Sequence, residues 1–106
     1  FADAGTTVTV GTLPANSVVL RGGVAVTVAF DGDTTNTLDI GTVADPNGFA
    51  TVLALGTIGN IVADEMATSD DALVTVATAV TAAVVSTASA AAGTAYIWVE
   101  YVPLGN

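Results

Sequence analysis

The stretch VAVTVAF at residues 24–30 decides the fold. It alternates larger apolar residues with small or polar ones, and this period of two is that of a β-strand, whose successive side chains point to opposite faces of a sheet. The residues on one face of the predicted strand are Val24, Val26, Val28 and Phe30. The stretch therefore predicts a strand with one face on a core.

Similar runs lie on both sides of this stretch, separated by turn signals. Pro14, the segment 31–36 with its Asp-Gly pair, and the segment 44–48 around Pro46 are typical of turns. Further strands are predicted at residues 6–12, 17–21, 37–43, 49–55, 72–78, 80–87 and 94–103. We expect Gly22 and Gly23 to end the strand at 17–21, and residues 56–69 to cross between sheets.

This pattern predicts an all-β fold, a β-sandwich of jelly-roll-like type with about seven to eight short antiparallel strands. Residues 1–106 form one domain in this interpretation, and residues 1–5 are left open as a flexible N-terminal arm. The alanine content of residues 77–92 would also fit a helix. Six Val and Thr residues in that segment favour a strand, because branching at Cβ restricts side-chain rotation in a helix.

Residues 72–93 carry no charge and are long enough to span a bilayer. Their Ser and Thr content is high, and no Lys or Arg flanks them to set a topology. Strands of a globular domain are the better interpretation, so we expect no contact with a membrane.

Charge and residue types exclude several classes of function. The chain carries 10 acidic residues against one basic residue, for a net charge of −9, and such a surface repels nucleic acid. It contains no His and no Cys, and its one cation is Arg21, so the usual general bases, thiol nucleophiles and Schiff-base amines are missing. We expect no catalytic residues, no cofactor and no metal site, and hence a protein that is not an enzyme.

Two groups of acidic residues leave alternatives open. Asp31, Asp33 and Asp45 lie in turns and could offer oxygen ligands to calcium, although turn composition alone explains them and no EF-hand spacing is present. The pair Asp64 and Glu65 fits a solvated loop, or an acidic patch that docks a basic partner.

The strand at 94–103 and Arg21 point to an interface. One face of this strand would carry Tyr96, Trp98, Glu100 and Val102, and the other Ile97, Val99 and Tyr101. Apolar residues on both faces suggest cover by the domain itself and by a neighbouring subunit. As the lone cation, Arg21 is expected to pair with a carboxylate within the chain or across a subunit contact. The candidate interface residues are Arg21, Tyr96, Trp98, Tyr101, Asp64 and Glu65.

Self-association is also expected from the composition of the core. The 52% hydrophobic content includes 20 Ala and 17 Val but only 6% aromatic residues, so small side chains would dominate the interior. Small side chains bury little apolar area each. A small domain with such a core and no disulfide often gains stability from oligomerisation.

Five turn and strand segments form a distinctive set: LPANSVVL (13–20), VTVAFDG (26–32), NTLDIGT (36–42), ADPNGFA (44–50) and WVEYVP (98–103). Together they resemble small virion structural proteins of tailed phages, of the head-decoration or cement type. The resemblance implies a β-sandwich or jelly roll that assembles with itself, commonly as a trimer. It also implies a place on the outer surface of the capsid, with the major capsid protein as partner.

Other functions fit the same composition. A phage tail, fibre or neck component belongs to the same class. A secreted carbohydrate-binding or adhesion module of sandwich fold belongs to a second class, and the small acidic β-domain of a halophile to a third.

Overall fold

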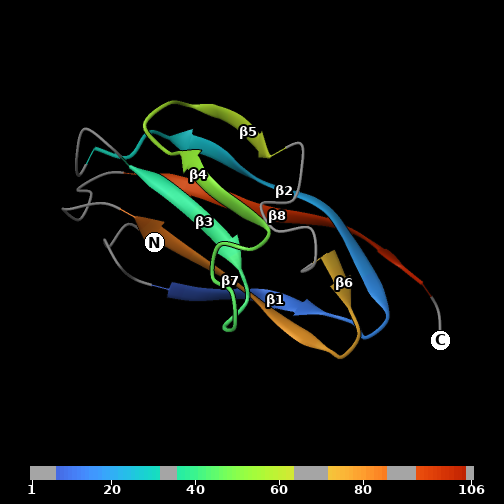
Figure 1. Cartoon of the computed structure of the whole chain (residues 1–106). Helices are drawn as coiled ribbons and strands as arrows, with labels where there is room; N and C mark the ends of the chain where they lie inside the picture. Colours follow the sequence, from blue (N-terminus) through green and yellow to red (C-terminus); the bar gives the residue numbers. More distant parts are fainter. Residues whose placement is uncertain (1–6, 32–35, 64–71, 86–92, 105–106) are drawn as a thin grey trace.

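The computed structural model describes residues 7–31, 36–63, 72–85 and 93–104, and these residues form strands joined by short loops (Figure 1). Every pairing between the strands is antiparallel. The strands are β1 (Thr7–Leu13), β2 (Ser17–Val28), β3 (Thr37–Gly41), β4 (Ala50–Ala54), β5 (Gly59–Ala63), β6 (Leu73–Val74), β7 (Thr78–Val85) and β8 (Thr94–Pro103). The predicted all-β sandwich of short antiparallel strands is confirmed.

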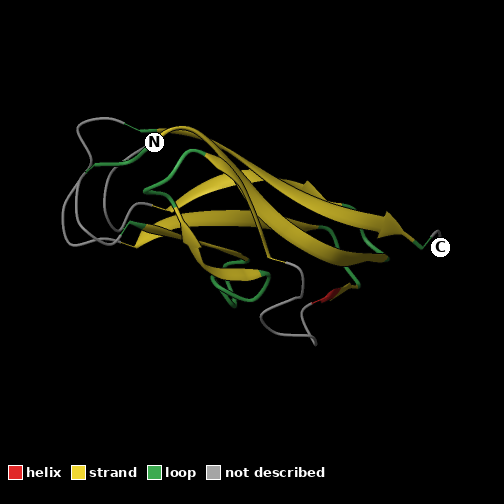
Figure 2. Ribbon diagram, turned by 90° about the horizontal axis from the view of Figure 1, so that it is seen from above, coloured by secondary structure: helices red, strands yellow, loops and turns green. Residues whose placement is uncertain are grey.

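Two sheets form the layers of the sandwich (Figure 2). The first sheet has the order β1-β7-β3-β4. In the second sheet β2 is central: β8 pairs along one side of it, and β5 and β6 pair along the other. Figure 1 shows β2 and β8 running side by side along the length of the molecule.

The strand β2 continues through Gly22 and Gly23, so the prediction of two strands separated by this pair is wrong. Neither glycine has a positive φ, and both pair in register with β5 and β8. A Cβ on Gly22 would lie 3.4 Å from Cδ1 of Ile40 in the opposite sheet, so this glycine allows close packing between the layers. The pair therefore serves packing and does not form a turn.

Two bulges in β2 change which residues face the core. Val19 pairs with Tyr101 and Arg21 with Glu100, which leaves Leu20 as an extra residue, and Thr27 is extra in the same way before Val28. A bulge breaks the alternation of side chains along a strand. Val28, predicted on the core face, is consequently 45% exposed.

The remaining strands differ from the prediction mainly at their ends. The strand predicted at 94–103 is confirmed as β8, and the strand predicted at 80–87 is β7, which begins at Thr78. The strand predicted at 72–78 shrinks to the two residues of β6. The crossing predicted within residues 56–69 is present, because the chain passes from β4 in the first sheet to β5 in the second, but β5 itself was missed.

Some predictions fall on residues outside the described part of the chain. They concern the arm at 1–5, most of the turn at 31–36, and most of the segment 88–93, which the sequence predicts as a loop between the last two strands. Within the segment where a helix was the alternative, residues 78–85 are strand β7 and residues 86–92 are not described. The turn at 44–48 is present, and the amide of Gly48 donates to the carbonyl oxygen of Asp45 at 3.0 Å.

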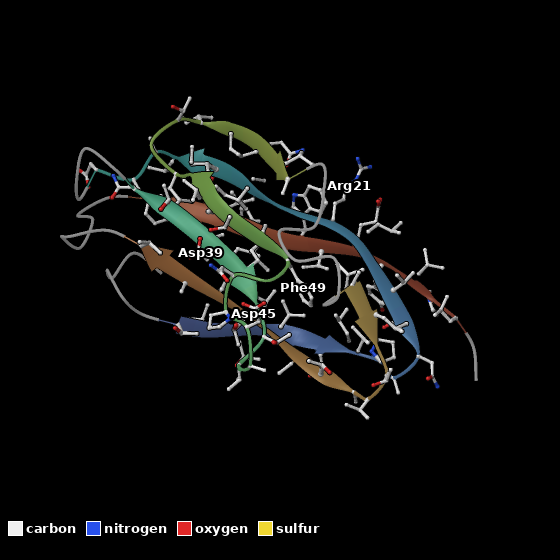
Figure 3. The ribbon with its side chains drawn as sticks, viewed as in Figure 1. Arg21, Asp39, Asp45 and Phe49 are labelled. Atoms are coloured by element: carbon white, nitrogen blue, oxygen red, sulfur yellow. The ribbon has the colours of Figure 1, made fainter. Side chains whose placement is uncertain are left out.

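Valine and leucine fill the core, and alanine contributes little to it. The buried apolar residues are Leu13, Val19, Val24, Val26, Phe30, Leu38, Ile40, Phe49, Ala50, Leu53, Leu55, Val74, Val80, Ala82 and Val84. Only two of them are Ala and two are aromatic. The largest fully buried side chain is that of Phe49, which follows the turn at 44–48 (Figure 3).

A strained bulge lies at the β4 edge of the first sheet. Thr51 and Val52 together oppose Asp39 of β3, whose Oδ1 accepts hydrogen bonds from Thr51 Oγ1 and from the amide of Val52, both at 3.0 Å. Val52 has a φ of 57°, a conformation that a β-branched residue rarely adopts. Strain of this kind costs about 1–3 kcal/mol.

We predict that Val52→Gly stabilises the protein. Glycine adopts positive φ freely, and the relief of strain outweighs its extra unfolded-state entropy, so the free energy of unfolding should rise by about 1 kcal/mol. Urea denaturation measures this change. Val76→Gly is the matched control, because Val76 is 67% exposed against 68% for Val52 and has no positive φ. The control should lower the free energy of unfolding. An equal loss in both variants would show that Val52 is not strained.

Candidate functional site

The two faces of β8 differ as strand alternation requires. Ala95, Ile97 and Val99 pack against the core. The alternate residues Tyr96, Trp98, Glu100 and Val102 therefore point away from the first sheet, on the outer side of the sandwich. This assignment of residues to faces agrees with the one made from the sequence.

Neighbouring strands extend this outer surface. Residues that pair directly across an antiparallel ladder share a face, so the β8 residues are joined by Arg21 and Gly23 of β2, Val62 of β5 and Leu73 of β6. We call this surface the outer face. Its residues are Val18, Arg21, Gly23, Ala25, Asn60, Val62, Leu73, Tyr96, Trp98, Glu100 and Val102.

At the centre of the outer face, the indole of Trp98 lies over Gly23 and reaches β5. Its Nε1 donates a hydrogen bond of 3.0 Å to Oδ1 of Asn60. A Cβ on Gly23 would overlap the six-membered ring of Trp98 and would lie 2.7 Å from the carbonyl oxygen of Ile61. Gly23 thus provides the space for the indole, and Asn60 sets its orientation. The ring is held in place across three strands.

Arg21 and Glu100 form an ion pair beside this ring, with Arg21 Nε 3.1 Å from Glu100 Oε1. Both side chains are about half exposed, and Arg21 projects away from the sandwich (Figure 3). Exposed pairs of this kind add little stability. The pairing predicted for the lone cation is present within the chain, and it leaves both charges accessible.

The rest of the outer face is mostly apolar and partly exposed. Tyr96 is 65% exposed, and Leu73 and Val102 are also among the exposed large hydrophobic residues. Asp39 and Asp45 belong to β3 and the loop that follows it, away from Arg21 (Figure 3). Among the described residues the outer face has balanced charge, although the whole chain carries −9.

Of the six predicted interface residues, the structure brings three together. Arg21, Tyr96 and Trp98 share the outer face. Tyr101 is opposite Val19, whose side chain is buried, so it points to the other side of the sheet, where it is 40% exposed near the end of β8. Asp64 and Glu65 lie outside the described residues.

Sequence reasoning missed Gly23 and Asn60 as parts of this face. A Gly-Gly pair is usually taken as a strand end, and only the position of Trp98 across the ladder shows why an extended glycine is needed. Asn60 belongs to β5, a strand that was not predicted. Gly23 and Trp98 are far apart in the chain, so no local sequence pattern indicates their contact.

Other features of the described residues offer little chemistry. A cavity of about 220 Å³ lies between the β3–β4 loop and β6, and its lining consists of threonine side chains and apolar residues such as Phe49 and Leu73. No group of three or more His, Cys, Asp or Glu side chains that could hold a metal ion occurs in the described ranges. In the same ranges no helix has the length and hydropathy needed to cross a membrane.

Comparison of the chain with protein-family models, with curated proteins and with solved structures finds no match. The outer face therefore has to be interpreted from its own geometry and chemistry.

We predict that Gly23→Ala lowers the free energy of unfolding by about 1–3 kcal/mol, because the added methyl group overpacks the space under the indole. The loss should be smaller in a Trp98→Ala background, where the overlap with the indole is gone and the Ile61 carbonyl remains close. A double-mutant cycle in urea measures this coupling. Gly56→Ala is the control, since open space surrounds Gly56 and its φ is not positive. Equal effects of Gly23→Ala and Gly56→Ala would show that the indole does not depend on Gly23.

Proposed function

We propose that this chain is a structural protein of a virus particle, a capsid decoration (cement) protein. It binds the outer surface of the capsid, associates with copies of itself, and stabilises contacts between major capsid subunits. In this proposal it has no catalytic activity, no cofactor and no contact with nucleic acid or membrane. Its work consists of burying surface across the seams between neighbouring subunits.

The outer face is the observation that supports the proposal. The centres of protein interfaces are depleted of Lys, Asp and Glu and enriched in Tyr, Trp and Arg, which also supply most of the binding energy. Arg21, Tyr96 and Trp98 lie together on a charge-balanced surface of a very acidic chain. Leu73, Tyr96 and Val102 add exposed apolar side chains to the same face, and exposed apolar side chains gathered on one face favour a binding surface.

The rigid placement of Trp98 also favours binding. A side chain that is already fixed loses little conformational entropy when a partner covers it. Gly23 and Asn60 hold the indole before any partner arrives. The resemblance to phage head-decoration proteins, carried by turn and strand segments, supplies the class of partner in this proposal.

We predict that Tyr96→Ala weakens binding to the capsid about tenfold or more, because truncating an aromatic residue at an interface centre commonly costs over 1 kcal/mol. The measurement is co-sedimentation of purified protein with particles of the encoding virus that lack this chain. Tyr96 is largely exposed, so the variant should fold normally.

Val43→Ala is the control for this experiment, because Val43 is 83% exposed and lies in the β3–β4 loop. Its affinity should equal that of the unmodified protein. Failure of the unmodified protein to bind such particles would refute the decoration function. Binding confined to the tail or neck would favour the alternative of a tail, fibre or neck component.

One feature favours a second candidate function, a carbohydrate-binding or adhesion module. Tyr96 and Trp98 stand two positions apart on the same face of β8, so the two residues are neighbours on a sheet surface. Aromatic side chains combine a large apolar area with a polar group, which suits a ligand with both kinds of surface. Binding to a glycan array, without binding to particles, would select this candidate.

A further inference from the structure

The four edges of the two sheets are not equally able to accept another strand. A strand at a sheet edge presents backbone amide and carbonyl groups that can pair with a further chain, and proteins commonly block such edges with bulges, charges or very short strands. In the first sheet, β1 carries Val10 as an extra residue, and β4 carries the strained bulge at Val52. In the second sheet, β5 and β6 have five and two residues.

The strand β8 has none of these protections along most of its length. It has 10 residues, and the extra residues in its ladder with β2 belong to β2, so β8 itself is regular. Its proline is at the last position, Pro103. Its single charged residue, Glu100, is already paired with Arg21. Among the described residues β8 has strand partners on one side only.

The core is also incomplete at the β8 edge. Val24 of β2 is 0% exposed, whereas its ladder partner Ile97, on the same inner side, is only partly buried. Val99 and Ala95 are likewise only partly buried. A further strand beside β8 would cover both these inward side chains and the outward Tyr96.

We propose that β8 pairs antiparallel with β8 of a second copy of this chain, so that the two second sheets join into one. The proposal deepens the self-association in the proposed function and rests on that part of it. A strand added at this edge must be apolar on both faces, and β8 meets that requirement itself. Such pairing is isologous, because each copy presents the same strand to the other.

Charge also favours a second copy at this edge over other parts of the described surface. Two chains of charge −9 repel one another, and the repulsion is smallest where each presents a balanced pair such as Arg21 and Glu100. Salt screens the remaining repulsion without weakening backbone hydrogen bonds or apolar contacts. Association through β8 should therefore tighten as the salt concentration rises.

The geometry limits the register of the pair. Directly opposed residues must share a face, so one residue of β8 lies directly opposite its own copy, and the twofold axis passes between the two. An axis at Trp98 or at Val99 pairs almost the whole strand, whereas an axis at Glu100 would place two carboxylates opposite each other. We therefore place the axis at Trp98 or Val99. This contact joins two copies, and a trimer would need a different surface.

Single cysteines test the pairing directly, because the chain has no cysteine of its own. The variants are Trp98→Cys and Val99→Cys, one for each possible axis, then Tyr96→Cys, Tyr101→Cys and, as a control in an exposed loop, Val43→Cys. A disulfide requires Cα atoms about 4.4–6.8 Å apart, which directly opposed residues satisfy and residues several positions from the axis do not. Non-reducing electrophoresis during mild oxidation measures the rate of cross-linking.

We predict that the variant at the axis, Trp98→Cys or Val99→Cys, cross-links about tenfold faster or more than Val43→Cys, because pairing raises the local concentration of the two thiols. Tyr96→Cys and Tyr101→Cys should be slower than this variant, since they lie farther from the axis. Circular dichroism of each reduced variant checks that it is folded. Equal rates at Trp98, Val99 and Val43 would overturn the proposal.

A second variant gives a readout that does not depend on cysteine. Tyr96→Lys adds a positive charge beside the edge and lowers the net repulsion between copies, yet it should shift sedimentation toward monomer, because a lysine beside the edge opposes strand addition. Val43→Lys makes the same charge change elsewhere and should not weaken association.

If the oligomer persists unchanged in Tyr96→Lys, and both Trp98→Cys and Val99→Cys cross-link slowly, self-association uses another surface and only the β8 pairing fails. If the protein is monomeric at every salt concentration, both the pairing and the self-association fail, whereas binding to particles is tested separately.

Discussion

The structure depends on one extended strand, β2, which carries hydrogen-bonded partners along both of its sides. It pairs with β8 on one side and with β5 and β6 on the other, so the second sheet exists only because β2 runs unbroken through Gly22 and Gly23. The first glycine lets the opposite sheet approach, and the second receives the indole of Trp98. A side chain at Gly23 would disturb the layer that holds the outer face.

Much of the fold can be predicted from the sequence, because strands with one buried face show a period of two. This period predicts the runs that form β3, β4, β7 and β8, and for β8 the predicted bounds equal the observed ones. The prediction is wrong where features other than this period decide which residues form a strand or face the core. Bulges at Leu20 and Thr27 shift the faces of β2 without a change in composition. The short strand β5 forms because β2 offers it an edge, which is a property of the assembled sheet.

The candidate site could likewise be predicted only where strand alternation or residue scarcity decides it. Alternation along β8 places Tyr96, Trp98 and Glu100 on one face, and scarcity alone predicts that Arg21 pairs with a carboxylate. The roles of Gly23 and Asn60 depend on contacts between residues distant in the chain, which a single sequence does not show. The acidic pair at residues 64 and 65 lies outside the described part of the chain, so its role stays a prediction.

The bulge at Val52 affects how the protein associates where many copies are crowded together. A β-protein with two open edges can recruit copies at both ends and grow into a fibril. Here the bulge at the strained Val52 makes the β4 edge of the first sheet irregular, and the extra residue Val10 interrupts the β1 edge. The one long regular edge among the described strands is β8. In the proposed pairing each molecule uses this edge for its partner, so strand addition would end with two molecules even where many copies lie side by side.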